Sequence, residues 1–296
     1  MMTKKRKLIA VLPTLLTLGN AACGFGAITY AAKVGPEYLG QAANGGGLTR
    51  MLGTSPGLYN SFENQHLFIA AVLIFVAMLF DALDGSAARW ANQTSEFGAQ
   101  LDSLCDAISF GVAPAFLMLQ MVQFRTDYHP RLLWVIALLF AVCTILRLAR
   151  FNVETEEEDT HEGFSGLPSP AAAGVVASFL IAMRGIYKLA ETEHDTLAKS
   201  IADWLIPAVA WSLPWITLAV AALMVSRIRY SHVFNQLFRG QRSRRHVLQL
   251  VFSMALVFLV QELAIPVLFC YFAFSSPIRA FWEEVVSGRL YKSKQI

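Results

Sequence analysis

Four aspartates lie close together in the sequence, between two long apolar segments: Asp81, Asp84, Asp102 and Asp106. If both flanks are helical, the first two stand three residues apart and the last two stand four apart, so each pair shares one helix face. Residues 90–97 separate the flanks and are long enough for the chain to reverse, which would bring the two pairs together. A charged aspartate costs about 3 kcal/mol at the centre of a membrane helix. The cluster therefore predicts compensating cations.

Carboxylate oxygens are the ligands that hard divalent ions prefer, and two such ions often assist displacement at phosphorus. Arg89 adds a planar cation suited to a phosphate or carboxylate. Gly85 and Gly98 lack side chains, so a ligand or a neighbouring backbone can come close. The alternative interpretation is that the aspartates only cap and solvate helix ends. It does not explain two chelating pairs together with glycines and an arginine.

This stretch reads Asp81-x-x-Asp84-Gly85-x-x-Ala88-Arg89, then eight residues, then Gly98-x-x-x-Asp102-x-x-x-Asp106. It resembles the signature of the CDP-alcohol phosphatidyltransferase family. The resemblance implies an integral membrane enzyme that moves a phosphatidyl group from a CDP-activated lipid to an alcohol and releases CMP. It implies two divalent cations, Mg²⁺ or Mn²⁺, held by Asp81, Asp84 and Asp102, with Asp106 as a shared ligand or the general base. It also implies a CDP pocket lined by Gly85, Arg89 and Gly98.

The elements that must position these residues follow from composition. Of the 296 residues, 55% are hydrophobic and only 15% are charged, which is typical of an all-α polytopic membrane protein and not of a soluble domain. The net charge of +3 is small and its basic residues cluster in loops, so no nucleic-acid partner is expected. Six apolar segments are each long enough to cross a bilayer of ~30 Å: 8–32, 66–89, 98–124, 131–150, 168–187 and 204–226.

We expect one membrane-embedded catalytic domain, 1–296, with a core over 8–227. Residues 33–65 are polar and glycine-rich, and we interpret them as an insertion loop or short surface helix. The last apolar stretch, 247–275, is interrupted near Gln261 and Pro266. A hairpin there is favoured over one long helix, because it returns the basic tail to the side where the chain starts. With the hairpin, about eight membrane segments are predicted.

Basic residues gather on the side of the N-terminus: Lys4 to Lys7, Arg89, Arg147, Arg150 and the run from Arg227 to Arg245. The positive-inside rule places this side, and with it the aspartates, in the cytoplasm. We therefore expect an integral protein of a prokaryotic inner or cell membrane, with its site facing the cytoplasm. On the first segment, Thr17 and Asn20 are one turn apart, and they could face the nucleotide or equally make a helix-packing contact.

Four further stretches resemble the membrane-embedded phosphatidylserine synthase branch of the same family: RLARFN (147–152), SGLPSPAAAG (165–174), LDSLCDAISFGVAPA and MVSRIRYS. The resemblance implies CDP-diacylglycerol and L-serine as substrates, with phosphatidylserine and CMP as products. Serine is a zwitterion, and its carboxylate needs a cation such as Arg147 or Arg150, while Asn152 can accept from its ammonium. The alternative roles are interfacial anchors for the arginines and a helix entry for SGLPSPAAAG.

Other functions also fit parts of the pattern. Within the family, glycerol 3-phosphate or inositol phosphate could be the acceptor. A divalent-cation transporter would also carry carboxylates inside the membrane, but it predicts them along a path through several helices. No serine, cysteine or histidine near the motif is an obvious covalent nucleophile, so a one-step displacement is favoured, with a carboxylate nucleophile as the open alternative. Relatives in the family are commonly homodimers embedded in membrane lipids, and the small residues 171–174 could pack helices closely.

Overall fold

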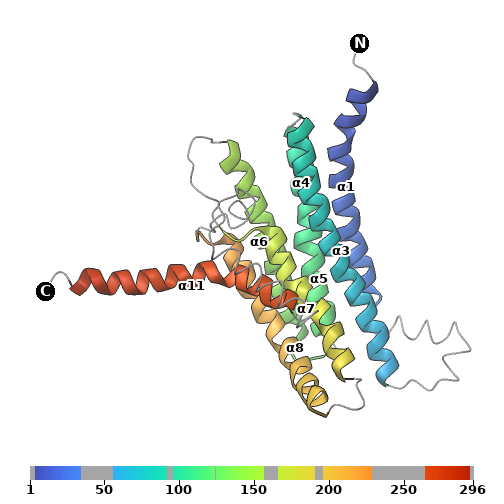
Figure 1. Cartoon of the computed structure of the whole chain (residues 1–296), viewed down its shortest axis with the longest axis vertical. Coiled ribbons are helices and arrows are strands. Elements are labelled where there is room, and N and C mark those ends of the chain that lie inside the picture. The colour runs from blue at the N-terminus through green and yellow to red at the C-terminus, as the bar shows by residue number, and fades with distance from the viewer. Residues whose placement is uncertain are drawn as a thin grey trace, which may run out of the picture.

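The structure is a computed structural model that describes residues 4–34, 56–91, 96–123, 125–156, 166–190, 196–228 and 264–293. Every regular element within these ranges is helical (Figure 1). The elements are α1 (Lys4–Ala32), α3 (Pro56–Ala91), α4 (Glu96–Asp106), the π-helix η1 (Ala107–Val112), α5 (Ala113–Val122), α6 (Pro130–Glu156), α7 (Ser169–Ala190), α8 (Thr196–Val225) and α11 (Ala264–Ser293).

Six stretches of the described chain are long and apolar enough to cross a membrane: Pro13–Ala32, Gln65–Gly85, Glu96–Val122, Pro130–Val153, Ser169–Lys188 and Lys199–Val225. The third runs continuously through α4, η1 and α5. In Figure 1 these helices run alongside one another as one bundle. The predicted all-α polytopic membrane fold and its six core segments are therefore confirmed, and the protein is an integral membrane protein.

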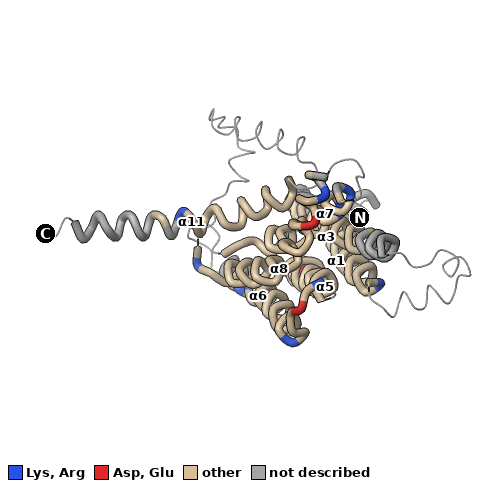
Figure 2. The backbone as a smooth tube through the Cα atoms, turned by 90° about the horizontal axis from the view of Figure 1, so that it is seen from below, with Lys and Arg blue, Asp and Glu red and all other residues tan. Residues whose placement is uncertain are grey.

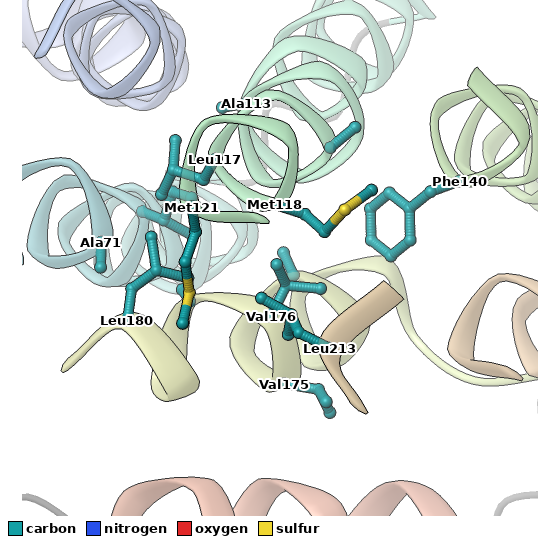
Figure 3. Close-up of a cluster of buried hydrophobic side chains, with 14 of the residues drawn as sticks. Ala71, Ala113, Leu117, Met118, Met121, Phe140, Val175, Val176, Leu180 and Leu213 are labelled. Atoms are coloured by element: carbon teal, nitrogen blue, oxygen red, sulfur yellow. The ribbon is translucent and has the colours of Figure 1, made fainter. Parts of the chain in front are cut away.

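The centre of the bundle is formed by the span Glu96–Val122 and by α7. Of their most apolar windows, 67% and 72% respectively are buried within the protein, against 28% to 39% for the other four spans. Figure 3 shows Met118 of α5 near Val176 of α7 and Phe140 of α6, with Leu117 of α5 on the side of Met121. These side chains are fully buried or nearly so. The helix that carries two of the aspartates is thus fixed on most of its sides.

The outer surface of the bundle is apolar. Large hydrophobic side chains are exposed along the other spans, among them Leu15, Phe25, Leu79, Trp134 and Ile145. Charged residues are sparse along the described part of the tube in Figure 2. Such a continuous apolar surface would be a liability in water and is the surface expected against lipid chains.

The region expected to be an insertion loop, 33–65, is partly helical. Helix α3 begins at Pro56, ten residues before the apolar segment. Proline is favoured in the first turn of a helix, and the turns after it carry polar residues that extend α3 beyond its apolar span. Residues 35–55 of the expected loop lie outside the described residues.

The expected C-terminal hairpin is only partly reproduced. Its second arm is helical, but α11 continues without a break from Ala264 past residue 275 to Ser293. Figure 1 shows α11 lying across the direction of the bundle instead of alongside it, and its apolar part, Ala264–Arg279, is shorter than a membrane span. The first arm falls within 229–263, outside the described residues. Six spans, not eight, are present in the described chain.

Candidate active site

Three aspartates from α3 and α4 meet at one point. Asp81 on α3 and Asp102 and Asp106 on α4 each present one carboxylate oxygen, and these oxygens all lie within 4.8 Å of one another. Only residues 92–95 separate the two helices in the sequence. Asp106 is buried and the other two are half-buried. Three carboxylates this close repel one another unless a cation or protons intervene.

Asp84, the fourth predicted ligand, is buried one turn further along α3 and lies close to Thr17 of α1. It is not among the three oxygens within 4.8 Å. One oxygen of Asp84, Oδ2, and one of Asp102, Oδ1, are buried without a hydrogen-bond partner in the described part of the chain. Unsatisfied carboxylate oxygens are costly in an apolar interior. An all-oxygen donor set of this kind fits a hard divalent cation.

A π-helix begins directly after Asp106. Short π-helical turns within α-helices are frequent at functional sites, and η1 carries the buried Ser109 toward α1. The Ser109 hydroxyl donates to the Asn20 carbonyl at 2.9 Å, and the Asn20 carboxamide Nδ2 donates to Asp106 Oδ1, also at 2.9 Å. The contact between α1 and η1 thus orients the Asp106 carboxylate. Asn20, predicted to face either a nucleotide or another helix, reaches an aspartate directly.

Gly24 makes this contact possible, because any side chain at this position would collide with Ser109. A Cβ atom on Gly24 would overlap the Ser109 hydroxyl and lie 2.7 Å from Ser109 Cα. We expect Gly24→Ala to push α1 away from η1 and to destabilise the protein by about 1 to 3 kcal/mol, the usual cost of overpacking. Thermal unfolding of the purified protein in detergent would measure the loss.

Gly19→Ala is the matched control on the same helix. A Cβ atom there would meet only the Phe80 ring, at 3.5 Å, which is an ordinary contact distance. The Gly19 variant should unfold within a degree or two of the wild type, since its expected cost is well below 1 kcal/mol. Equal melting temperatures for the two variants would show that the close approach at Gly24 does not constrain α1.

An arginine side chain from another helix reaches the aspartates. Arg147 of α6 lies close enough to Asp81 and Asp106 for its charge to act on both carboxylates. Its Nη1 donates to the Ser169 hydroxyl at 2.7 Å, and its Nε is buried without a hydrogen-bond partner in the described chain. Arg147 therefore combines a counter-charge for the carboxylates with a free donor.

The other predicted contacts are distributed around this centre. Arg150 is half-buried one turn after Arg147 on α6. Asn152 exchanges hydrogen bonds with Ser103, next to Asp102, at 3.0 and 3.2 Å. Gly85 borders open space, since a Cβ atom there would meet nothing within 4 Å. Gly98 is half-buried in the first turn of α4, while the side chain of Arg89 lies outside the part that the structure describes.

The small residues 171–174, considered for packing between chains, are used within the chain. Ala172, Ala173 and Gly174 are buried. Gly174 faces Phe269 of α11 so closely that a Cβ atom would overlap the ring. Phe269 also stacks edge-on against Phe75 of α3, with ring centroids 5.5 Å apart. The run thus seats α11 on α7 and α3.

Sequence reasoning missed three polar residues of this centre: Ser103, Ser109 and Ser169. Ser103 lies in α4 and Ser109 lies in η1, while Ser169 lies in the stretch interpreted as a helix entry. A serine in an apolar helix usually bonds its own backbone, so its type alone gives no signal. The glycine at position 24 opposite Ser109 was visible, but only the helix pairing shows that the two meet.

Comparison with known proteins adds independent findings. Residues 10–223 match the family model described as CDP-alcohol phosphatidyltransferase. A protein of Methanocaldococcus jannaschii named CDP-diacylglycerol–serine O-phosphatidyltransferase is 32% identical over 166 residues, 56% of this chain and 65% of the relative. A Mycobacterium bovis protein of the same name is 42% identical over 108 residues, 35% of this chain and 36% of the relative.

A third relative, named archaetidylserine synthase, comes from Methanothermobacter thermautotrophicus. It is 37% identical over 167 residues, which cover 55% of this chain and 58% of the relative. This chain therefore spans less than two thirds of the length of each of the three curated relatives. All three names contain the word serine.

Proposed function

Because this chain belongs to the CDP-alcohol phosphatidyltransferase family, we propose that it transfers the phosphatidyl group of CDP-diacylglycerol to L-serine and releases CMP. The observation that carries the proposal is the meeting of three aspartate oxygens within 4.8 Å, on the motif that the family shares. The names of the relatives support serine as the acceptor.

Asp81, Asp84, Asp102 and Asp106 would hold two divalent cations, Mg²⁺ or Mn²⁺. When bound, such ions neutralise a pyrophosphate and stabilise the negative charge that builds on the departing CMP. The cytidine diphosphate would lie along Gly85, Arg89 and Gly98, with Thr17 and Asn20 below it. The open space at Gly85 supports this placement, because a substrate can approach the backbone there.

Asp106 would act as the general base. It accepts the proton of the serine hydroxyl as the serine oxygen forms a bond to the phosphorus nearest the diacylglycerol. The bond between that phosphorus and the bridging oxygen breaks, and CMP leaves with the bonding electron pair. The hydrogen bond from Asn20 holds one Asp106 oxygen in place, so that the other can face the hydroxyl. One displacement completes the transfer without a covalent enzyme intermediate.

Arg147, Arg150 and Asn152 would form the serine site. Arg147 carries a positive charge beside Asp81 and Asp106, where the carboxylate of a serine poised for attack would also need a cation. Arg150 follows one turn later on the same helix, and Asn152 is joined to Ser103 at the edge of the aspartate cluster. The aspartates themselves can accept from the serine ammonium.

The site would face the cytoplasm of a prokaryotic inner or cell membrane, since the loops on that side hold the larger share of lysine and arginine. A cytoplasmic site also matches the release of a nucleotide, which is consumed there. A homodimer embedded in membrane lipids is the assembly that we expect from the family.

The decisive test is CMP release by the purified protein in detergent, with CDP-diacylglycerol and Mn²⁺ or Mg²⁺. L-serine, glycerol 3-phosphate and inositol phosphate are compared side by side. Release that depends on L-serine supports the proposed reaction. Release with another acceptor keeps the chemistry but rejects serine, and no release with any of the three would turn attention to divalent-cation transport.

Replacing Arg150 with alanine tests the serine site. Loss of a charged contact to the serine carboxylate is expected to raise the KM for L-serine by about tenfold or more. The KM for CDP-diacylglycerol should stay close to the wild-type value, because the nucleotide pocket is formed by other helices. Steady-state kinetics with each substrate varied in turn would measure both constants. An unchanged KM for L-serine would remove Arg150 from the acceptor site.

A further inference from the structure

The segment before α7 is fastened to the end of α8. Backbone N–H groups of Gly166 and Leu167 donate to the carbonyls of Ile228 and Leu223, at 2.9 and 3.1 Å. Gly166 adopts a positive φ of 87°, and a Cβ atom there would collide with the Met224 carbonyl. Glycine is the residue that fits both constraints. Leu167 is fully buried, so the start of α7 is fixed in position.

This fixed start presents the Ser169 hydroxyl to Arg147. Ser169 is completely buried in the first turn of α7, and its oxygen accepts from Arg147 Nη1 at 2.7 Å. A hydrogen bond from a cation at this distance belongs to the stronger class in proteins. The guanidinium is planar and rigid, so anchoring one nitrogen determines where its remaining N–H groups point.

The anchored guanidinium faces the active site. Its charge acts on Asp81 and Asp106, and its buried Nε–H has no partner among the described residues. A long arginine side chain would otherwise distribute itself over several rotamers, and fixing it in advance removes that cost from substrate binding. The unpartnered donor is then available to an anionic group of a substrate.

We infer that Ser169 is a positioning residue: it holds Arg147 so that the free Nε–H of the guanidinium is presented to the carboxylate of the acceptor. The inference rests on the proposed function for the identity of that acceptor. Ser169 itself does not touch the substrate. Ser169 acts through Arg147. The backbone hydrogen bonds of Gly166 and Leu167 to the end of α8 hold Ser169 in position.

Kinetics of the full-length protein in detergent test this with Ser169→Ala. The variant should raise the KM for L-serine by about tenfold, the typical value of a hydrogen bond to a charged group, while the KM for CDP-diacylglycerol changes little. Ser178→Ala is the matched control, because Ser178 is equally buried on α7 but donates only to Val175 of its own helix. Ser169→Thr retains the hydroxyl and should recover most of the affinity for L-serine.

A double-mutant cycle with Arg147→Lys shows whether Ser169 acts through the arginine. Lysine lacks the planar guanidinium that Ser169 holds. In the Arg147→Lys background, Ser169→Ala should therefore change the KM for L-serine by less than about twofold further, whereas the effects of independent sites would multiply. If the effects of the two substitutions on the KM for L-serine multiply, the inference is wrong. It is also wrong if the Ser169→Ala variant has the same serine KM as Ser178→Ala, or if it raises both substrate KM values equally.

A spectroscopic measurement separates this inference from the proposed function. Arginine labelled with the heavy nitrogen isotope gives an Nε–H resonance for Arg147, assigned by its loss in Arg147→Lys. Ser169→Ala should shift or broaden that resonance, and Ser178→Ala should leave it unchanged. If the protein uses another acceptor, the cycle is measured with that acceptor; if it turns over none, the proposed function fails and the resonance alone decides. An Arg147 Nε–H resonance that is unchanged in Ser169→Ala overturns the inference.

Discussion

Asp106→Asn is expected to lower the turnover number by about a thousandfold, within the range for loss of a general base. Asparagine keeps the shape of the side chain and can still pair with Asn20, but it cannot take the proton of the attacking hydroxyl. The buried hydrogen bond from Asn20 fixes the side chain at position 106 on α4, so the substitution should change the chemistry of the group and not its place. CMP release in the presence of saturating CDP-diacylglycerol, L-serine and Mn²⁺ is the measurement.

Asp127→Asn serves as the control for this variant. Asp127 is exposed, between α5 and α6 at the end of the bundle away from the aspartate cluster, and its replacement should leave turnover unchanged. Mn²⁺ binding must be measured on both variants, because Asp106 is also one of the three converging carboxylates. Normal turnover by an Asp106→Asn protein that still binds the metal would show that another group is the base.

Asp81→Asn is expected to weaken the affinity for Mn²⁺ by roughly a hundredfold. Loss of a residue that only hydrogen-bonds to a metal ligand already weakens metal affinity by about ten- to a hundredfold, and Asp81 is proposed as a ligand itself. Asp81 supplies one of three oxygens within 4.8 Å and is the one contributed by α3. Removing its charge leaves the two remaining oxygens of this group on α4, and Asp84, outside the group, as the remaining proposed ligand on α3. The Mn²⁺ concentration for half-maximal CMP release, together with calorimetric titration, would measure the shift.

The control is Asp203→Asn on α8, an exposed carboxylate near the opposite end of the bundle. Its metal dependence should match the wild type. Chelation by EDTA should abolish CMP release by the wild-type protein, and Mn²⁺ or Mg²⁺ should restore it. An Asp81→Asn protein with wild-type affinity for Mn²⁺ would exclude Asp81 from the metal site.

Spacing along the chain predicted much of this centre. Aspartates three and four residues apart in apolar segments can share a face only if the segments are helices, and the short connection between them requires reversal. Hydropathy likewise predicted the six spans, because crossing a membrane demands a minimum apolar length. Both arguments are local: each depends only on residues near one another in the sequence.

Features that join distant segments were not predictable in this way. Gly24 and Ser109 meet because a π-helix turns Ser109 toward α1, and nothing in the local sequence AISFGV requires that turn. Arg147 and Ser169 meet only because the segment before α7 is held by α8. Hydropathy gives the length of an apolar segment but not its direction, so the course of α11 across the bundle was missed.

The order in which these groups leave the ribosome has a consequence for how the protein is made. Asp81, Asp102 and Asp106 are synthesised before Arg147, the cation that lies beside them. Each uncompensated aspartate adds up to about 3 kcal/mol to the free energy of inserting its helix, the value for the helix centre. A nascent chain that does not yet contain α6 therefore lacks the counter-charge of Arg147, and insertion of the early helices relies on the long apolar stretches that surround the aspartates.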